Sequence, residues 1–325
     1  MKKSSIRSPY LMGIALILAC SHCKPSSTQS DSSISATKVW SQKAGQIQDP
    51  NRKTLEFGIG PWYTAEETNI YTRPVLNYLE EQTGYRFILN ITDTYEELVT
   101  NFQNQHLDVA DLSASLYDQL LRNDSHTSQY LGTNTSKVGD KMSSHYRGII
   151  FTHKNSDIRR LEDLKGRTFA FVDQGSSSGF KYPLVTLVKA GIEPKRDFTE
   201  IFYVGNHDAV ANSVAGKKVA AGAIWDLELE NAEKVHGKIF RRLAQTSPIP
   251  REAWISQKSL PAELTASIQK ALASLKPETK LKSGQPVFSK KAAYNGFTVE
   301  SEEFYKVVGE TSNIVQRYLK KYPNP

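Results

Sequence analysis

Short apolar runs alternate with amphipathic stretches along the chain from Leu55 onward. Runs rich in Phe, Ile and Val are typical of buried strands, and apolar residues three and four positions apart are typical of helices. The pattern predicts strands over 55–60, 85–89, 107–110, 146–152, 168–172, 198–204 and 219–225, and helices over 73–82, 95–104, 161–166, 180–190, 208–215, 261–275 and 301–321. This alternation predicts an α/β fold made of two βα series, the second of which begins near Ile158.

The N-terminus has the pattern of a secretory signal. Two lysines precede an apolar stretch over 11–19, which is too short for a membrane span. Ile17-Leu18-Ala19-Cys20 resembles the lipobox of bacterial lipoproteins, in which the cysteine is lipidated and becomes the mature N-terminus. Plain secretion is the alternative. We therefore predict a signal peptide over 1–19, a lipid on Cys20, and a location in the periplasm or cell envelope, anchored to a bacterial membrane.

A serine-rich polar segment follows the signal, and we assign residues 20–50 to the lipidated N-terminus and a flexible tether. Cys20 and Cys23 are the only cysteines of the chain. The folded body therefore has no disulfide scaffold, no cysteine-based zinc site and no cysteine nucleophile.

The net charge of +7 includes three positive charges in the first 19 residues. The remaining excess is small and dispersed, which excludes the dense basic stripe that is typical of nucleic-acid binding. It is compatible with a small anionic ligand. We predict no metal and no cofactor.

The most informative segment is Gly175-Ser176-Ser177-Ser178-Gly179, which lies between a predicted strand and a predicted helix. Backbone N–H groups at a helix N-terminus are unpaired and attract anions, and the three hydroxyls add further donors. This arrangement predicts a site for a small oxyanion, with simple capping by one serine as the alternative. The segment also matches the G-x-S-x-G elbow of serine hydrolases. Only His236 lies late enough to complete that triad order, so a binding protein is favoured over an enzyme.

Residues 147–254 resemble the phosphate-, phosphite- and phosphonate-binding proteins of ABC importers. The resemblance is carried in order by residues 161–173, 175–179, 189–192, 205–210, 221–226 and 247–250. It is looser in the first half, at 57–61, 74–79 and 107–110, and covers about residues 55–305.

The resemblance implies a type II periplasmic-binding-protein fold, with two α/β lobes joined by a hinge. Lobe 1 is expected over 55–152 plus 253–325 and lobe 2 over 155–250, with the hinge near 153–154 and 248–252. The implied function is an exported, lipid-anchored monomer that captures a phosphonate, phosphite or phosphate and delivers it to ABC permease and ATPase subunits. A lipoprotein that senses the same ligand without transport is the alternative.

The resemblance also implies the ligand-binding residues. The oxyanion would be held by hydroxyl, backbone and imidazole donors, which fall on Tyr95, Tyr146, Ser176, Ser177, Ser178 and His207. Two acids, Asp226 and Glu252, would read the rest of the ligand, for example an ammonium group. Asp111 and Ala220 depart from the usual pattern of the family, which leaves the choice of oxyanion open.

Overall fold

The structure is a computed structural model that describes residues 53–123, 127–138, 140–290 and 292–323. These residues belong to one compact unit. The predicted signal peptide, Cys20 and the tether lie outside the described residues. In the described part of the chain, no helix has both the length and the apolar character needed to cross a membrane.

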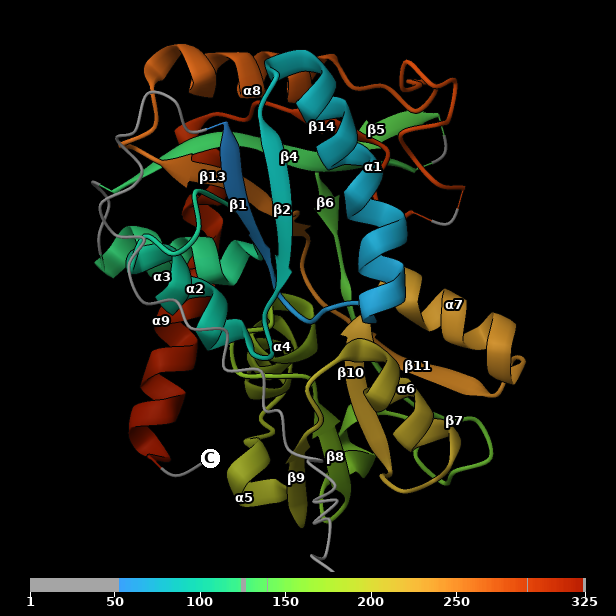
Figure 1. Cartoon of the computed structure of the whole chain (residues 1–325). Coiled ribbons are helices and arrows are strands. Elements are labelled where there is room, and N and C mark those ends of the chain that lie inside the picture. Colours follow the sequence, from blue (N-terminus) through green and yellow to red (C-terminus); the bar gives the residue numbers. More distant parts are fainter. Residues whose placement is uncertain (1–52, 124–126, 139, 291, 324–325) are drawn as a thin grey trace, which may run out of the picture. The chain divides into compact units, whose positions relative to one another are not determined.

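A seven-stranded sheet is built from both ends of the described chain (Figure 1). Its main strand order is β14-β4-β13-β3-β1-β2, and β5 pairs with β4. The strands are β1 (Thr54–Ile59), β2 (Arg86–Ile91), β3 (Val109–Leu112), β4 (Ser128–Val138), β5 (Lys141–Ser143), β13 (Ala253–Gln257) and β14 (Gly296–Thr298). β1 is parallel to β2 and β3, whereas β13 is antiparallel to β3 and β4.

A five-stranded sheet has the order β11-β7-β10-β8-β9. Its strands are β7 (Gly148–His153), β8 (Thr168–Phe171), β9 (Glu200–Tyr203), β10 (Ala221–Trp225) and β11 (Phe240–Gln245). β8 is parallel to β9 and β10, and β7 is antiparallel to β10 and β11. The predicted lobe boundary at residue 152 places β7 in the first lobe, but this apolar strand pairs on both edges within the second sheet. β6 (His145–Tyr146) and β12 (Ile249–Pro250) form a separate short ribbon.

The helices around the first sheet are α1 (Ala65–Thr83), α2 (Tyr95–Gln103), α3 (Ala114–Asn123) and α8 (Ala262–Ser274). α1 is longer than the predicted helix over 73–82. Thr64 and Glu67 form a capping box that fixes its start, and Pro74 is accommodated inside the helix. It ends at Gly84, whose φ of 73° is a left-handed conformation that favours glycine.

The second sheet carries η2 (Leu161–Leu164), η3 (Ser177–Lys181), α4 (Tyr182–Lys189), α5 (Pro194–Asp197), α6 (His207–Ala215) and α7 (Asp226–His236). α6 packs against β10 and α7 (Figure 1). The helix predicted over 180–190 is in fact preceded by η3, a π-helical turn that contains two of the three serines. A π-turn is rare and frequently occurs at functional sites.

The last helix, α9 (Lys306–Lys321), follows the short turn η4 (Glu302–Tyr305) and contacts elements of both sheets. The Ser312 hydroxyl donates to Asp118 on α3 at 2.5 Å. The Tyr318 hydroxyl accepts from the backbone N–H of Lys195 on α5 at 2.8 Å. Tyr318 also packs in the hydrophobic cluster of the second sheet. α9 is expected in lobe 1, but it packs beside both sheets.

The parallel strands of each sheet position the loops that carry the candidate residues. β1, β2 and β3 lead into the loops before α1, α2 and α3, and β8, β9 and β10 lead into η3, α6 and α7. In α/β sheets, ligands bind outside the carboxyl ends of such strands. Two sets of strand ends are therefore available for one site.

Candidate oxyanion-binding site

One cavity brings together all the predicted ligand residues except Asp226. It is lined by Trp62, Tyr63, Tyr95, Ser113, Tyr146, Ser176, Ser177, Ser178, His207, Trp225 and Glu252. The cavity is small, with a volume of about 20 Å³. That is room for one or two waters, and it suits a compact ligand.

The serine loop is held by its own backbone bonds. The Asp173 carboxylate accepts from the Gly175 N–H at 2.6 Å, and the Ser176 hydroxyl caps the π-turn by accepting from the Gly179 N–H at 3.0 Å. A Cβ atom on Gly175 would lie 2.7 Å from the Tyr95 Cβ, so glycine is needed for this close approach. The loop is therefore fixed directly against the start of α2.

Ser177 joins this loop to α3. Its hydroxyl donates to the Ser115 hydroxyl at 2.8 Å and accepts from the Ser115 N–H at 3.0 Å, and both residues are buried. The hydroxyl proton of Ser177 is therefore engaged with α3. An oxyanion at this point would meet the Ser177 backbone N–H, which lies in the first turn, where helical N–H groups have no partner within the helix.

His207 is a neutral donor. It is the first residue of α6, which Asn206 caps by accepting from the Ala209 N–H at 2.8 Å. Burial lowers the pKa of His207 to about 3, so the ring is uncharged at neutral pH. The Trp225 N–H donates to His207 Nδ1 at 3.4 Å. A neutral ring that accepts at Nδ1 carries its proton on Nε2, which leaves Nε2–H as a donor for the cavity.

Two tyrosines face the serines. Burial raises the pKa of Tyr95 above its usual value, and a hydrogen-bonding interaction with Ser176 opposes this rise. Burial also raises the pKa of Tyr146, followed by the charge of Glu252, while an interaction with Ser178 lowers it. Both hydroxyls are therefore protonated donors.

The two candidate acids differ in position. Glu252 lines the cavity and is partly exposed. Asp226 does not line it, because its carboxylate is occupied at the start of α7. There Oδ1 accepts from the Leu227 N–H at 3.0 Å and Oδ2 accepts from the Arg147 N–H at 3.2 Å. The structure thus engages the Asp226 carboxylate with backbone N–H groups in the first turn of α7.

Asp111, the first departure from the family pattern, is buried in β3 behind the cavity. Burial is the main cause that raises its pKa well above the usual range, and the charge of Glu252 adds to the effect. The raised pKa favours the protonated form of Asp111, which carries no negative charge. This reduces the conflict with an oxyanion that the sequence alone suggests.

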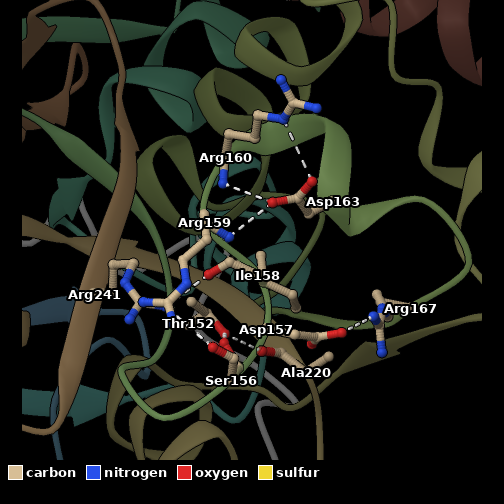
Figure 2. Close-up of polar contacts among 10 residues, drawn as sticks. All are labelled: Thr152, Ser156, Asp157, Ile158, Arg159, Arg160, Asp163, Arg167, Ala220 and Arg241. Atoms are coloured by element: carbon tan, nitrogen blue, oxygen red, sulfur yellow. Dashed lines mark hydrogen bonds and ion pairs between the residues drawn. The ribbon is translucent and has the colours of Figure 1, made fainter.

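Ala220, the second departure, lies away from the cavity, at the start of β10 (Figure 2). Its carbonyl accepts from the Thr152 hydroxyl at 2.6 Å. The adjacent segment is held by Arg241, which donates to the Ile158 carbonyl at 2.7 Å. Ala220 therefore belongs to the packing of this segment.

Sequence reasoning missed four residues that line the cavity, which are Trp62, Tyr63, Ser113 and Trp225. The Trp62 ring lies 5.3 Å from that of Tyr95, and the Tyr63 ring lies 6.1 Å from that of Trp225, measured between centroids. Three of the four follow β1 or β3 closely, and Trp225 ends β10. The rule that finds the serine loop at a strand end would have found them too.

A family model described as "ABC transporter, phosphonate, periplasmic substrate-binding protein" matches residues 57–305. The chain belongs to this family. Among curated members and relatives, it is 26% identical over 180 residues to the phosphate-import protein PhnD of Mycolicibacterium smegmatis, covering 54% of this chain and 56% of that protein. It is 24% identical over 204 residues to the probable phosphite-binding protein PhnD1 of Prochlorococcus marinus, covering 59% and 62%. The matched part is thus less than two thirds of the length of either relative.

A solved structure of PhnD1 from Prochlorococcus marinus, in complex with methylphosphonate, superposes with a TM-score of 0.72. The match covers 82% of this chain and 99% of that chain at 18% sequence identity. The predicted type II periplasmic-binding-protein fold is confirmed.

Proposed function

We propose that this chain is an exported solute-binding protein that captures a compact phosphonate-like oxyanion for an ABC importer. The observation that carries the proposal is the convergence of the serine loop, the neutral His207 and two tyrosines on one small cavity. The named ligands of the relatives, which are phosphate, phosphite and methylphosphonate, agree with this chemistry.

The donors suit an anion with several oxygens. The serine loop offers first-turn N–H groups and hydroxyls, His207 offers Nε2–H, and the tyrosines offer O–H groups from the opposite side. Each hydrogen bond to a charged group contributes roughly 1.5–3 kcal/mol. Several such bonds offset the cost of removing water from the oxyanion.

The cavity size narrows the ligand class. A cavity of about 20 Å³, lined in part by Trp62 and Tyr63, favours a small tetrahedral oxyanion over a bulkier ligand. We therefore expect phosphite, phosphate or methylphosphonate to fit better than phosphonates with longer chains. Glu252 would favour a ligand that carries a cation or a proton on that side.

The two predicted lobes would close around the ligand. Trp62, Tyr95 and Ser113 come from elements next to the first sheet, whereas Ser177 and His207 come from elements next to the second. The chain passes between the sheets near β6 and β12. Because β7 belongs to the second sheet, we move the first hinge crossing from the predicted 153–154 to β6, and keep the second near 248–252. Binding of one oxyanion to both sets of residues would stabilise the closed form.

Thermal melting of the full-length protein tests the binding class. The panel is phosphate, phosphite, methylphosphonate, 2-aminoethylphosphonate and sulfate. A ligand at 100 times its Kd stabilises the folded protein by about 2.7 kcal/mol, which raises the Tm clearly. A shift with a compact phosphorus oxyanion and none with sulfate supports the proposal, and a panel without any shift contradicts it.

Membrane attachment through Cys20 is part of the proposal and rests on the lipobox-like segment 17–20. We expect Cys20→Ala to move the protein from the membrane to the soluble fraction of producing bacteria. Metabolic labelling with a fatty acid should be lost in the same variant. Continued membrane association would contradict the lipid anchor without affecting the proposed ligand site.

The arrangement gives no support to the hydrolase alternative. Ser177, the residue of the elbow-like motif, bonds to Ser115, and His236 bonds through Nε2 to Asn212 Oδ1 at 2.8 Å. A serine nucleophile needs a base within hydrogen-bonding reach. His236 is not among the residues that line the cavity.

A further inference from the structure

Lys181 is a buried cation directly behind the serine loop. It is the last residue of η3, four residues after Ser177, and only 9% of it is exposed. Its backbone N–H donates to the Ser176 carbonyl at 3.0 Å, which ties it to the loop. Its ammonium group donates to the Ser115 carbonyl at 3.5 Å. Ser115 is also the residue that bonds to the Ser177 hydroxyl.

Lys181 lines a second, larger cavity, together with Asp173, Gln174 and Gly175 at the start of the serine loop. The volume of this second cavity is about 630 Å³. The charged and titratable groups that line it with Lys181 are Glu96 of α2, Asp118 and Arg122 of α3, Asp173 of the loop after β8, and Tyr203 of β9. The residues of α9 that line it are uncharged, and they are Ser312, Val315, Gln316 and Leu319.

The nearby carboxylates are already occupied. Asp118 accepts from Arg122 Nε at 2.9 Å and from the Ser312 hydroxyl at 2.5 Å, and Asp173 accepts from the Gly175 N–H. Within the described ranges, Lys181 has no carboxylate oxygen within the 4.0 Å of an ion pair. A buried charge without a close partner is costly, so an anion nearby would stabilise it.

The groups that line the oxyanion cavity lack a positive charge. The serines, the tyrosines and His207 are neutral, and Glu252 is negative. Arg251 is buried near Tyr146, with its guanidinium 5.6 Å from the ring centroid, and its charge acts on the pKa of Tyr63 and Tyr146, so it belongs to the tyrosine side. Lys181 is therefore the cation on the serine side of the cavity.

We propose that Lys181 supplies the positive potential that retains the oxyanion in the adjacent cavity, acting through the serine loop rather than by contact with the ligand. It is a positioning residue in this sense, and the inference rests on the proposed function. Because only 9% of Lys181 is exposed, its charge is screened less than a charge on the surface.

The charge of Lys181 is also pH-dependent. Burial lowers the pKa of Lys181 to about 8, which the charges of Asp118 and Asp173 partly oppose. The group is therefore charged at pH 7 and loses its proton as the pH rises above 8. A bound anion favours the charged form, so the benefit to binding is present at neutral pH and is lost at alkaline pH.

The test compares Lys181→Met with Lys189→Met in the full-length protein. Lys189 is exposed at the end of α4, so its replacement removes the same charge far from the loop. Calorimetry gives the Kd for phosphite and for methylphosphonate at pH 7 and pH 9.5. The ratio of variant to wild-type Kd at one pH cancels the ionisation of the ligand.

We expect Lys181→Met to weaken binding at least about tenfold at pH 7, which is about 1.4 kcal/mol. The ratio should approach one at pH 9.5, and Lys189→Met should bind like the wild type at both values. Lys181→Arg should retain most of the affinity at pH 7. Melting of the ligand-free variants checks folding, and Lys181→Gln provides a second neutral variant if the methionine disturbs the packing.

The outcomes are separable. If the wild type binds neither probe, the proposed function is wrong. If the wild type binds and both neutral variants bind equally well at pH 7, the role of Lys181 is wrong while the proposed function stands. A weakening that is the same at pH 7 and pH 9.5 would assign Lys181 a packing role and would also overturn the inference.

Discussion

The two sides of the oxyanion cavity are built differently. On the side of the second sheet, Ser176, Ser177 and His207 lie at the starts of helical segments, and backbone bonds fix each of them. On the side of the first sheet, Trp62 and Tyr63 contribute rings that pack against other aromatic residues. The residues on the side of the second sheet are suited to donate hydrogen bonds. The rings on the side of the first sheet are suited to limit the size of the ligand.

This difference suggests a division of roles. Donors that are fixed before the ligand arrives lose little entropy on binding, so the side of the second sheet should determine the affinity for the ligand. Rigid rings enclose the ligand and exclude water, so the side of the first sheet should determine which substituents of the ligand fit. The acids behind and beside the rings, Asp111 and Glu252, would then adjust the charge that the ligand is allowed to have.

The largest effect is expected from His207→Ala, which removes a donor from the affinity-determining side. The affinity for phosphite should fall about 10- to 100-fold, because a hydrogen bond to a charged group contributes roughly 1.5–3 kcal/mol. The pKa of about 3 also predicts that His207 causes no change in affinity between pH 5 and 7. Calorimetry at both pH values measures the two effects.

His236→Ala is the matched control, because His236 bonds to Asn212 away from the cavity. It should bind phosphite like the wild type. If His207→Ala also binds normally, the donors are not concentrated on the side of the second sheet, and the comparison fails.

A smaller effect, with opposite signs for two ligands, is expected from Glu252→Gln on the other side. Removing this negative charge should strengthen phosphite binding by about three- to tenfold, since like charges repel in a partly buried site. Binding of 2-aminoethylphosphonate, if it occurs, should weaken because its ammonium loses a partner. Competition between the two ligands measures both changes in affinity. If the affinities for both ligands change equally, Glu252 does not act on the bound ligand.

The sequence predicts the second side of the cavity better than the first. The serine motif and His207 stand at junctions between strand and helix, where the local pattern and the chemistry coincide. The aromatic lining depends on how β1 pairs with β3 and β3 pairs with β13, a strand that follows β3 more than 140 residues later. Pairing over such a distance leaves no local signal. For the same reason, the predicted lobe boundary at residue 152 places β7 in the wrong lobe.

Other features of the site depend on burial, which a sequence pattern does not report. Lysine is commonly exposed, but Lys181 is buried, because η3 packs against several other elements, α3 and α9 among them. The sequence predicts that Asp226 contacts the ligand, but its carboxylate instead accepts from two backbone N–H groups at the start of α7. The family resemblance supplied the residue types of the site, and the structure decided which of them face the cavity.

The smallest effect on binding is expected from Asp111→Asn. Burial raises the pKa of Asp111, so the folded protein keeps this proton to a higher pH than the unfolded chain does. The folded state then binds more protons than the unfolded state above about pH 4, and stability falls as the pH rises through that range toward the raised pKa. Asparagine has nearly the same shape as aspartate and does not ionise, so the variant avoids this loss of folding stability.

We therefore expect the Tm of Asp111→Asn to exceed that of the wild type by at least about 2 °C at pH 7, since one pKa unit is worth about 1.4 kcal/mol. The difference should shrink as the pH is lowered toward 4, where the carboxyl is protonated in both states. Phosphite binding at pH 7 should change less than about twofold, because a neutral Asp111 exerts no charge on the ligand. A large gain in affinity would instead mean that Asp111 is ionised beside the cavity, and the first side would then select against dianions through both of its acids.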